Sequence, residues 1–390
     1  MADIRFRNGR MARERLIKSY FNQGYAYKEI VAILYTRYNI SLSVRQLKRI
    51  LREHGLYRRK HLDRMEDVAI AIEELSTSGS LLGYRLMHHR IRCSYGLRTN
   101  RETVRQILGA LDPDGVEART SRRLRRRLYW AAGPNYIWHI DGNDKLIPYG
   151  FAIHGAIDGY SRKVIWLEVG PSNKDPSITA GYFLDWVRKL GGTALRIRMD
   201  PGTENGLTAQ LHSVLTDGNG LSTFGKSSAN QRIECWWSFL KKSFLRWWIN
   251  LFKDMISIGL LNNADPLHIE GVRYFFGRIL QKSLQRVLSE WNSHRIRTVS
   301  ESESPGGIPD VLYFAPELSD ANDYKMACEN ETVDQLEKFV DRWPNVFPCT
   351  PEMIELVNIV MERECNPRNA EEATEMYAEF LLRIRHVQQD

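Results

Sequence analysis

Three acidic residues of this chain are placed where they could hold metal ions. Asp141 ends one apolar run, Asp200 ends another, and Glu234 lies inside the helix-like stretch 230–237. Two carboxylates at strand ends and a third on a helix suit phosphodiester cleavage by two metal ions, because hard oxygen ligands hold Mg²⁺ or Mn²⁺ and leave positions open for water and phosphate. We therefore expect these three residues to be the catalytic residues and the metal ligands.

The surroundings of the two aspartates favour this interpretation. Asp200 opens a Pro-Gly segment that ends a strand abruptly and leaves the carboxylate at its C-terminal edge. Asp141 likewise precedes a Gly-Asn-Asp sequence typical of turns. The alternative is that both aspartates only satisfy backbone donors in turns, and that Glu234 is a solvated helix residue. The grouping of all three acids favours the metal site.

Several ordered motifs accompany these acids, and they occupy residues 138–146, 157–162, 230–234 and 291–294. With these motifs the chain resembles, over residues 80–316, the integrase catalytic core of retroviral integrases, retrotransposon integrases and insertion-sequence transposases, in its eukaryotic mobile-element form. The resemblance implies a ribonuclease H-like core in which Asp141 bridges two metal ions while Asp200 and Glu234 each complete one site. The 33 residues between Asp200 and Glu234 suit that family.

The chain also departs from the family pattern. Met199 stands where a serine commonly precedes the second aspartate, and Cys235 precedes two tryptophans where a bulky residue and one tryptophan are more usual. Neither change removes a metal ligand. The paired His and Cys of a structural zinc module are absent, so we predict no structural zinc. The cysteines are scattered, at Cys93, Cys235, Cys328, Cys349 and Cys365, which favours a reducing compartment.

The resemblance implies a DNA-binding polynucleotidyl transferase, a transposase or integrase. Such an enzyme hydrolyses a phosphodiester at an element end, and the exposed 3′-hydroxyl then attacks a target phosphodiester. Its partner is double-stranded DNA, at the element ends and at the target, bound by a homo-oligomer, and its eukaryotic form implies the nucleus. Two alternatives stay open: a domesticated, catalytically silent helix-turn-helix DNA-binding protein, and a ribonuclease H-like nuclease acting on RNA/DNA hybrids.

Charge is unevenly spread along the 390 residues. Residues 1–130 hold 28 Lys and Arg against 13 acids, net +15, residues 131–316 hold 20 against 17, net +3, and residues 317–390 hold 7 against 17, net −10. A basic front end of this size favours phosphate backbones. A membrane surface is disfavoured, since no apolar run approaches a spanning length and the first residues do not resemble a signal peptide.

We expect an α/β protein: a ribonuclease H-like catalytic core with an N-terminal all-α helix-turn-helix region and a C-terminal helical extension. The regions are a helix-turn-helix region at 1–60, a second helical DNA-binding unit at 61–118, a basic linker at 119–130, an integrase-type catalytic core at 131–316 and an acidic helical tail at 317–390. A helix is expected at 354–361. The tail is interpreted as a helical appendage, a site for a protein partner, or a partly disordered segment.

The first region carries a pattern typical of DNA-binding helices. Ser43 and Gln46 form a capping box after a turn at 38–41. The helix that follows has an apolar inner face made of Val44, Leu47, Ile50 and Leu51. Its outer face is basic, as a recognition helix in a major groove requires, with Arg45, Lys48, Arg49 and Arg52. The alternative is a solvated basic helix in an ordinary three-helix bundle.

A second pair of helices is predicted at 82–96 and 100–108, with Asn100 as an N-cap. A basic run follows it, made of Arg119, Arg122, Arg123, Arg125, Arg126 and Arg127. Such a run serves as a phosphate-binding linker, as a nuclear localisation signal, or as both. A solvated helix face is a weaker interpretation, because like charges at this density repel one another without an anionic partner.

The core elements follow in an order that suits mixed α/β. Strands are expected at 151–157, 164–169 and 194–199, and an amphipathic helix at 178–190. Residues 201–227 show little periodicity and several glycines, and the resemblance implies that they border a mobile active-site loop.

The Glu234 helix has an apolar stripe, made of Ile233, Trp236, Leu240, Phe244 and Trp247. We interpret the tryptophans as core rather than as base-stacking platforms. Ser238, Lys241 and Lys242 follow Glu234 at offsets of four, seven and eight, on another face. Basic residues one and two turns beyond a metal ligand suit bound DNA, so phosphate contacts are expected at Lys241, Lys242, Arg232 and Lys226.

Overall fold

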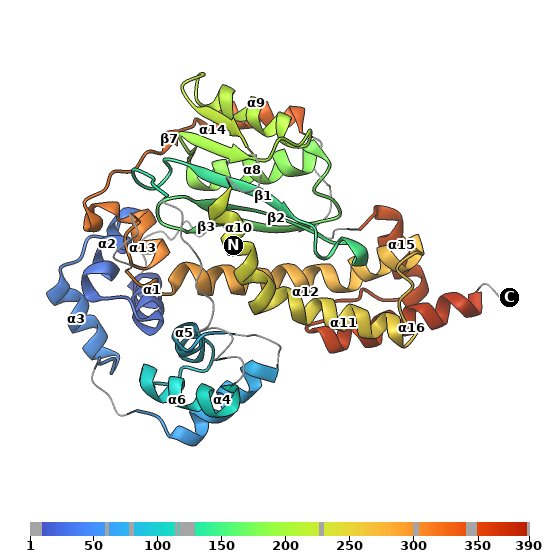
Figure 1. Cartoon of the computed structure of the whole chain (residues 1–390), viewed down its shortest axis with the longest axis horizontal. Coiled ribbons are helices and arrows are strands. Elements are labelled where there is room, and N and C mark those ends of the chain that lie inside the picture. Colours follow the sequence, from blue (N-terminus) through green and yellow to red (C-terminus); the bar gives the residue numbers. More distant parts are fainter. Residues whose placement is uncertain are drawn as a thin grey trace. The chain divides into compact units, whose positions relative to one another are not determined.

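The computed structural model describes residues 10–58, 62–77, 82–113, 116, 129–225, 230–298, 304–340 and 349–387. They form two compact units. The N-terminal unit contains the described residues up to Gly133 together with those of Glu290–Asp323, and the sheet unit contains those of Pro134–Ser289 and Tyr324–Asp390. Figure 1 labels most of the helices and several of the strands. Among the described helices, none is both long and apolar enough to span a membrane.

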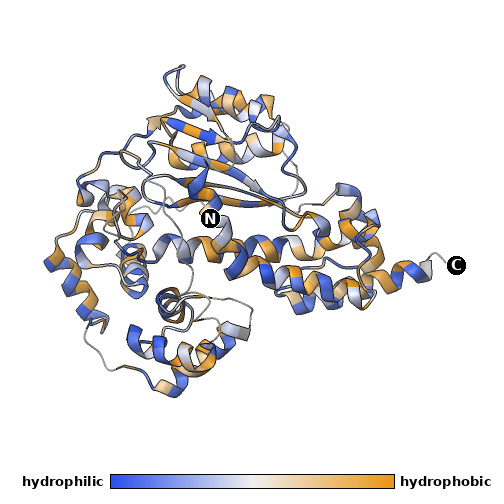
Figure 2. Ribbon diagram, viewed as in Figure 1, coloured by the Kyte–Doolittle hydropathy of each residue, from blue (hydrophilic) through white to orange (hydrophobic). Residues whose placement is uncertain are grey.

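The described elements of the N-terminal unit are helical: α1 (Arg10–Gln23), α2 (Tyr27–Tyr38), α3 (Val44–Glu53), α4 (Met65–Thr77), α5 (Tyr84–Ser94), α6 (Arg101–Leu111) and α13 (Pro309–Phe314), followed by a 3-10 turn at Pro316–Ser319. The predicted capping box is confirmed, because Ser43 Oγ accepts from Gln46 N and Gln46 Oε1 accepts from Ser43 N. Asn100 caps α6 by accepting from Thr103 N at 2.7 Å. Hydrophilic and hydrophobic segments alternate along these helices in Figure 2, as amphipathic helices around a shared core require.

The segment after the long helix α12 (Pro266–Ser293) contributes to the core of the N-terminal unit. Ile308 and Val311 join the buried cluster formed by α1, α2 and α3. Tyr25 donates a hydrogen bond to Asp310 at 3.4 Å. The helices near the start of the chain therefore depend on residues that follow α12.

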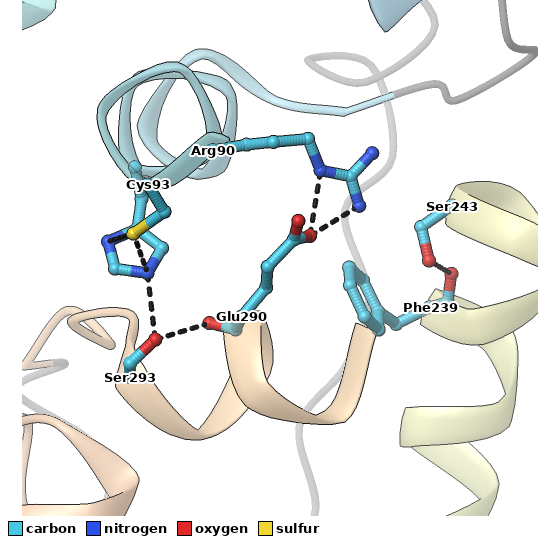
Figure 3. A network of polar contacts seen from close by, with 7 residues as sticks. Arg90, Cys93, Phe239, Ser243, Glu290 and Ser293 are labelled. Atoms are coloured by element: carbon cyan, nitrogen blue, oxygen red, sulfur yellow. Dashed lines mark hydrogen bonds and ion pairs between the residues drawn. The ribbon is translucent and has the colours of Figure 1, made fainter. Parts of the chain in front are cut away.

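A buried ion pair fixes α5 to the last turn of α12 (Figure 3). Arg90 Nε and Nη2 both lie 2.7 Å from Glu290 Oε2, and both side chains are buried. Beside this pair, His89 of α5 contacts the residue one turn after Glu290 on α12. Its Nε2 lies 3.0 Å from Ser293 Oγ and 3.5 Å from Cys93 Sγ. Burial, together with neighbouring positive charges, lowers the pKa of His89 to about 3. His89 is therefore neutral in the folded unit.

The sheet unit contains a five-stranded mixed sheet in the order β3-β2-β1-β5-β6. Its strands are β1 (Trp138–Asn143), β2 (Ala152–Asp158), β3 (Val164–Gly170), β5 (Arg196–Met199) and β6 (Leu221–Phe224). The pairs β1–β2 and β2–β3 are antiparallel, and the pairs β1–β5 and β5–β6 are parallel. The predicted strands at 151–157, 164–169 and 194–199 are confirmed with small shifts of their ends. A short pair, β4 (Gly192–Thr193) and β7 (Met326–Ala327), forms a second sheet.

Helices α8 (Pro176–Leu190), α9 (Asn205–Leu215) and α10 (Gln231–Leu240) cover the two faces of the main sheet, and the chain also forms α11 (Arg246–Ser257) and a 3-10 turn at Ile147–Tyr149. His154 stacks on Tyr182 of α8, whereas the next residue, Gly155, faces Trp237 of α10. Because successive strand residues point to opposite faces, α8 and α10 lie on opposite sides (Figure 1). The predicted helix at 178–190 is confirmed within α8.

Residues 201–227, which the resemblance implies border an active-site loop, contain α9 and β6 in their described part. The inner face of α9 buries polar Asn205, Thr208 and His212 beside Leu211 and Leu215. His212 is satisfied there by Ala194 O at 2.9 Å. Leu207, Leu211 and Leu215 recur every four residues, so the sequence does carry a helical period here, although polar residues share the inner face.

A π-helical turn at Lys241–Leu245 corrects the predicted apolar stripe. Ile233, Trp236, Leu240 and Phe244 are buried as expected, but Trp247 is half-buried and Trp248 is buried instead. A π turn adds one residue to the helical repeat, so every position after it is displaced by one. The stripe therefore continues through Trp248.

Apart from β7, the regular elements of the acidic tail are helical where it is described. It contains α14 (Asn330–Leu336), a 3-10 turn at Glu337–Phe339, α15 (Pro351–Met361) and α16 (Ala370–Val387), which confirms the helix predicted at 354–361. Tyr377 and Phe380 of α16 pack against Phe275 of α12. Within the sheet unit, the tail is therefore joined to the core by aromatic packing.

Candidate active site

The pairing of β1 with β5 places two of the predicted carboxylates at the same level. Trp138 is the register partner of Ile197 and His139 that of Arg198, and the same offset sets Asp141 level with Asp200. The parallel strands therefore deliver both aspartates to one region of the sheet. One detail of our prediction is wrong: β1 does not end at Asp141, because Gly142 and Asn143 continue its antiparallel pairing with β2.

A buried asparagine anchors the start of α10 to β1. Asn230 precedes the first residue of α10, and its side chain makes no capping hydrogen bond. Instead, Asn230 Nδ2 donates to Ile140 O at 3.0 Å, and His139 Nδ1 lies 2.6 Å from Asn230 Oδ1. Since that asparagine oxygen can only accept, the imidazole donates. Both side chains are buried, so these bonds fix where the helix that carries Glu234 begins.

The same helix contacts Asp141 directly. Trp237 Nε1 donates to Asp141 Oδ2 at 2.8 Å, and the indole is buried. Gly155, the register partner of Asp141, leaves room for the ring. A Cβ added at Gly155 would lie 3.1 Å from Trp237 Cη2, closer than ordinary contact.

Asp200 is held by its own loop. Asn205 Nδ2 donates to Asp200 O at 3.0 Å. Thr179 of α8 donates to Glu204 O at 3.2 Å. These bonds join the loop after β5 to the starts of α8 and α9, so the second aspartate also sits on a fixed backbone.

The three predicted carboxylates interact electrostatically. The pKa of Asp141 is raised to about 7, mainly by burial and with added contributions from the negative charges of Asp200 and Glu234, although hydrogen bonds from Trp237 and the Gly142 backbone oppose the rise. Burial also raises the pKa of Glu234, and the charge of Asp200 adds to that rise. A nearby positive charge favours the ionised form of such carboxylates.

The donor set fits hard divalent cations. Three carboxylates, one on β1, one directly after the parallel strand β5 and one on a helix fixed to β1, offer the oxygen ligands that Mg²⁺ and Mn²⁺ prefer. Among the described residues, however, no three His, Cys, Asp or Glu side chains lie close enough together to hold a metal ion. The three acids thus lie within electrostatic reach of one another without forming a closed cage.

The basic residues predicted to contact DNA are differently placed. Lys241 and Lys242 are exposed, whereas Arg232 is half-buried and donates to Gly159 O at 3.1 Å. On α3 every predicted contact residue is exposed, namely Arg45, Lys48, Arg49 and Arg52. The remaining predictions lie outside the described residues, at Arg122, Arg123, Arg125, Arg126, Arg127 and Lys226, as does Arg119 of the same basic run.

Two residues at the site were not anticipated as functional. We interpreted Trp237 as core, and Asn230 was only part of a motif. A usable signal was present, since Asn230, Glu234 and Trp237 are spaced by four and three residues and therefore share one face of a helix. What the sequence could not show is that this face meets His139 and Asp141.

A mixed five-stranded sheet with helices on both faces, an N-terminal helical unit and carboxylates gathered beside two parallel strands define the ribonuclease H-like class, as predicted. The chain matches the integrase core domain over residues 128–323, which is half of its length. It belongs to the integrase core domain family, a family of polynucleotidyl transferases that are in general transposition and integration enzymes. A comparison with curated proteins finds no match.

Proposed function

We propose that this chain is a transposase or integrase that cleaves DNA at the ends of an element and joins the exposed 3′-hydroxyl to target DNA. The observation that supports this most is the electrostatic coupling of Asp141 with Asp200 and Glu234 beside β1 and β5. Asp141, Asp200 and Glu234 would together hold the Mg²⁺ or Mn²⁺ ions. Bound divalent cations supply positive charge that lowers the pKa of water and stabilises the leaving oxygen.

The protein's own residues hold and orient this site. Asn230 and His139 fix the start of α10 on β1, and Trp237 fixes the Asp141 carboxylate. Asn205 fixes the backbone of Asp200. A transition state tolerates little displacement of its ligands, so a site held by buried side chains on strands and a helix suits catalysis better than one on surface loops.

DNA binding is assigned to the basic surfaces. We propose that α3 is the second helix of a helix-turn-helix and lies in the major groove with Arg45, Lys48, Arg49 and Arg52 toward the DNA. Lys241 and Lys242 are exposed on the helical segment that follows Glu234, which suits contacts to phosphates near the reacting bond. The arginines of the basic linker are proposed to bind DNA phosphates independently of sequence. Assembly of several copies on DNA and location in the nucleus belong to the same proposal.

A strand-transfer assay tests the proposed function. The full chain is incubated with supercoiled plasmid and labelled duplex oligonucleotides of randomised end sequence, with Mg²⁺, with Mn²⁺ or with EDTA. We expect label covalently joined to plasmid with either ion and none with EDTA. Cleavage confined to an RNA/DNA hybrid would support the ribonuclease H-like nuclease instead, and DNA binding without cleavage or joining would support the catalytically silent DNA-binding protein.

A further inference from the structure

The contact between α10 and β1 joins two of the proposed metal ligands through one side chain. Trp237 lies three residues after Glu234, so the two share one face of α10. The Trp237 indole donates to Asp141 Oδ2 at 2.8 Å. The helix that carries the third carboxylate therefore also holds the first.

The surroundings of the indole indicate a fitted contact. The ring is buried over Gly155 of β2, where an added Cβ would lie 3.1 Å from Cη2. A tryptophan used only to fill a core can satisfy its N–H with any nearby acceptor. Here the acceptor is the side-chain oxygen of Asp141, and an ionised carboxylate with one lone pair occupied by the indole keeps others for a cation.

We propose that Trp237 is a positioning residue: its indole N–H holds the Asp141 carboxylate in the orientation that binds a divalent cation. This rests on the proposed function, because it presumes that Asp141 is a metal ligand. Hydrogen-bond partners of metal ligands fix the orientation of those ligands, and their loss typically weakens metal affinity by about 10-fold to 100-fold. Trp237 contacts neither DNA nor metal in this proposal. Its removal should therefore change the metal concentration that cleavage needs rather than the rate of cleavage at saturating metal.

Trp237→Phe is the direct test, because it keeps a buried aromatic ring and removes the N–H. Trp186→Phe is the matched control, since the Trp186 indole donates to a different carboxylate of the same unit, Glu168, at 3.1 Å. Mn²⁺ binding to the full chains is measured calorimetrically without DNA. We expect about 10-fold to 100-fold weaker binding in Trp237→Phe and unchanged binding in Trp186→Phe. Wild-type affinity in Trp237→Phe, or an equal loss in both variants, would overturn the proposal.

Kinetics separate positioning from a merely structural role. Trp237→Phe is expected to raise the Mn²⁺ concentration that gives half-maximal DNA cleavage, with most of the maximal rate recovered at saturating Mn²⁺. A reduced maximal rate at an unchanged Mn²⁺ requirement would contradict positioning. If Trp237→Phe fails to fold, Gly155→Ala displaces the ring instead and is expected to weaken Mn²⁺ binding in the same direction. Unchanged binding in a folded Gly155→Ala protein would then overturn the proposal.

Asp141→Asn, measured in the same calorimetric experiment, separates failure of the Trp237 positioning role from failure of the proposed metal site. If Asp141→Asn loses Mn²⁺ binding while Trp237→Phe keeps it, the positioning role fails and the proposed metal site stands. If Asp141→Asn binds Mn²⁺ as the wild type does, the proposed metal site itself fails.

Discussion

Asp141 is half-buried, bonded to an indole and coupled to two other carboxylates, whereas Arg45 and Arg52 on α3 are exposed on a helix surface. The two regions thus use charge in opposite ways. The acidic site brings like charges within electrostatic reach of one another, and a buried indole donates to one of them. The basic face presents exposed arginines and Lys48 to solvent. Substitutions at the acidic site should therefore affect chemistry alone, and those on α3 should affect recognition alone.

The largest effect is expected from the carboxylates. Asp141→Asn, Asp200→Asn and Glu234→Gln should each lower Mg²⁺-dependent DNA cleavage by at least about 1000-fold, because a bound metal ion contributes several kcal/mol of transition-state stabilisation. DNA affinity, measured by fluorescence anisotropy, should be largely retained, since each change removes a ligand and little packing. A variant that still cleaves would exclude its residue from the site.

The buried ion pair of the N-terminal unit should contribute strongly to stability. Arg90→Met leaves the Glu290 charge buried without its partner, which should cost about 3 to 5 kcal/mol of unfolding free energy. Both side chains are buried, and the bond is 2.7 Å. Denaturant unfolding of the full chain measures this. Arg105→Met is the control, because its ion pair with Glu102 is exposed and its loss should change stability little. Equal effects would mean that burial of the first pair does not matter.

Changes on α3 should be smaller and should affect specificity. Arg45 and Arg49 are exposed and lie one turn apart, so each can reach base edges. Replacing either with Ala should reduce the preference for specific DNA by about 1 to 3 kcal/mol per lost bidentate contact. Competition between the chain's preferred DNA and a scrambled sequence measures this. Equal losses on both sequences would show that α3 binds phosphates only, and specificity would then be sought in α6.

The smallest effect concerns pH and a buried histidine of the sheet. Burial lowers the pKa of His154 to about 3, and Trp166 Nε1 donates to its Nδ1 at 3.1 Å. Below pH 6.5 the His154 side chain is protonated in the unfolded chain but stays neutral in the folded chain. Its contribution to the free energy of unfolding is therefore fully present above pH 6.5 and is lost progressively as the pH falls toward 3. The contribution is at most about 1.4 kcal/mol per pH unit.

His154→Asn removes this titration. Between pH 6.5 and 4.5 the unfolding free energy of the wild type should fall more steeply than that of the variant, by about 1.4 kcal/mol per pH unit. Part of the pH dependence of the unfolding free energy remains in the variant, because other histidines, such as His89, are also buried and have a lowered pKa. Identical slopes in the variant and the wild type would show that His154 does not resist protonation in the folded state.

Much of the fold followed from local patterns. The capping box at Ser43 and the β2, β3 and β5 strands are where turn residues and apolar runs place them. These signals are local, because a cap or a strand end depends on residues a few positions apart. α9 was not predicted, although Leu207, Leu211 and Leu215 recur at helical spacing, and the stripe beyond Phe244 is displaced by a π turn.

The supporting contacts of the candidate site could not be predicted in the same way. The bond between Trp237 and Asp141 joins residues 96 positions apart, and that between Asn230 and His139 joins residues 91 apart. Both depend on how α10 crosses the sheet, which no local spacing determines. The contribution of Ile308 and Val311 to the helices at the start of the chain has the same cause.

The central claim, that Asp141, Asp200 and Glu234 surround one metal site, can be tested by metal-directed cleavage of the protein itself. Fe²⁺ replaces Mg²⁺, and ascorbate with peroxide generates hydroxyl radicals at the bound iron, which cut the nearby backbone. We predict cuts near all three residues in the wild type, suppressed by excess Mg²⁺ and lost in Asp141→Asn. Cuts elsewhere, or cuts that persist in Asp141→Asn and resist Mg²⁺, would contradict the claim.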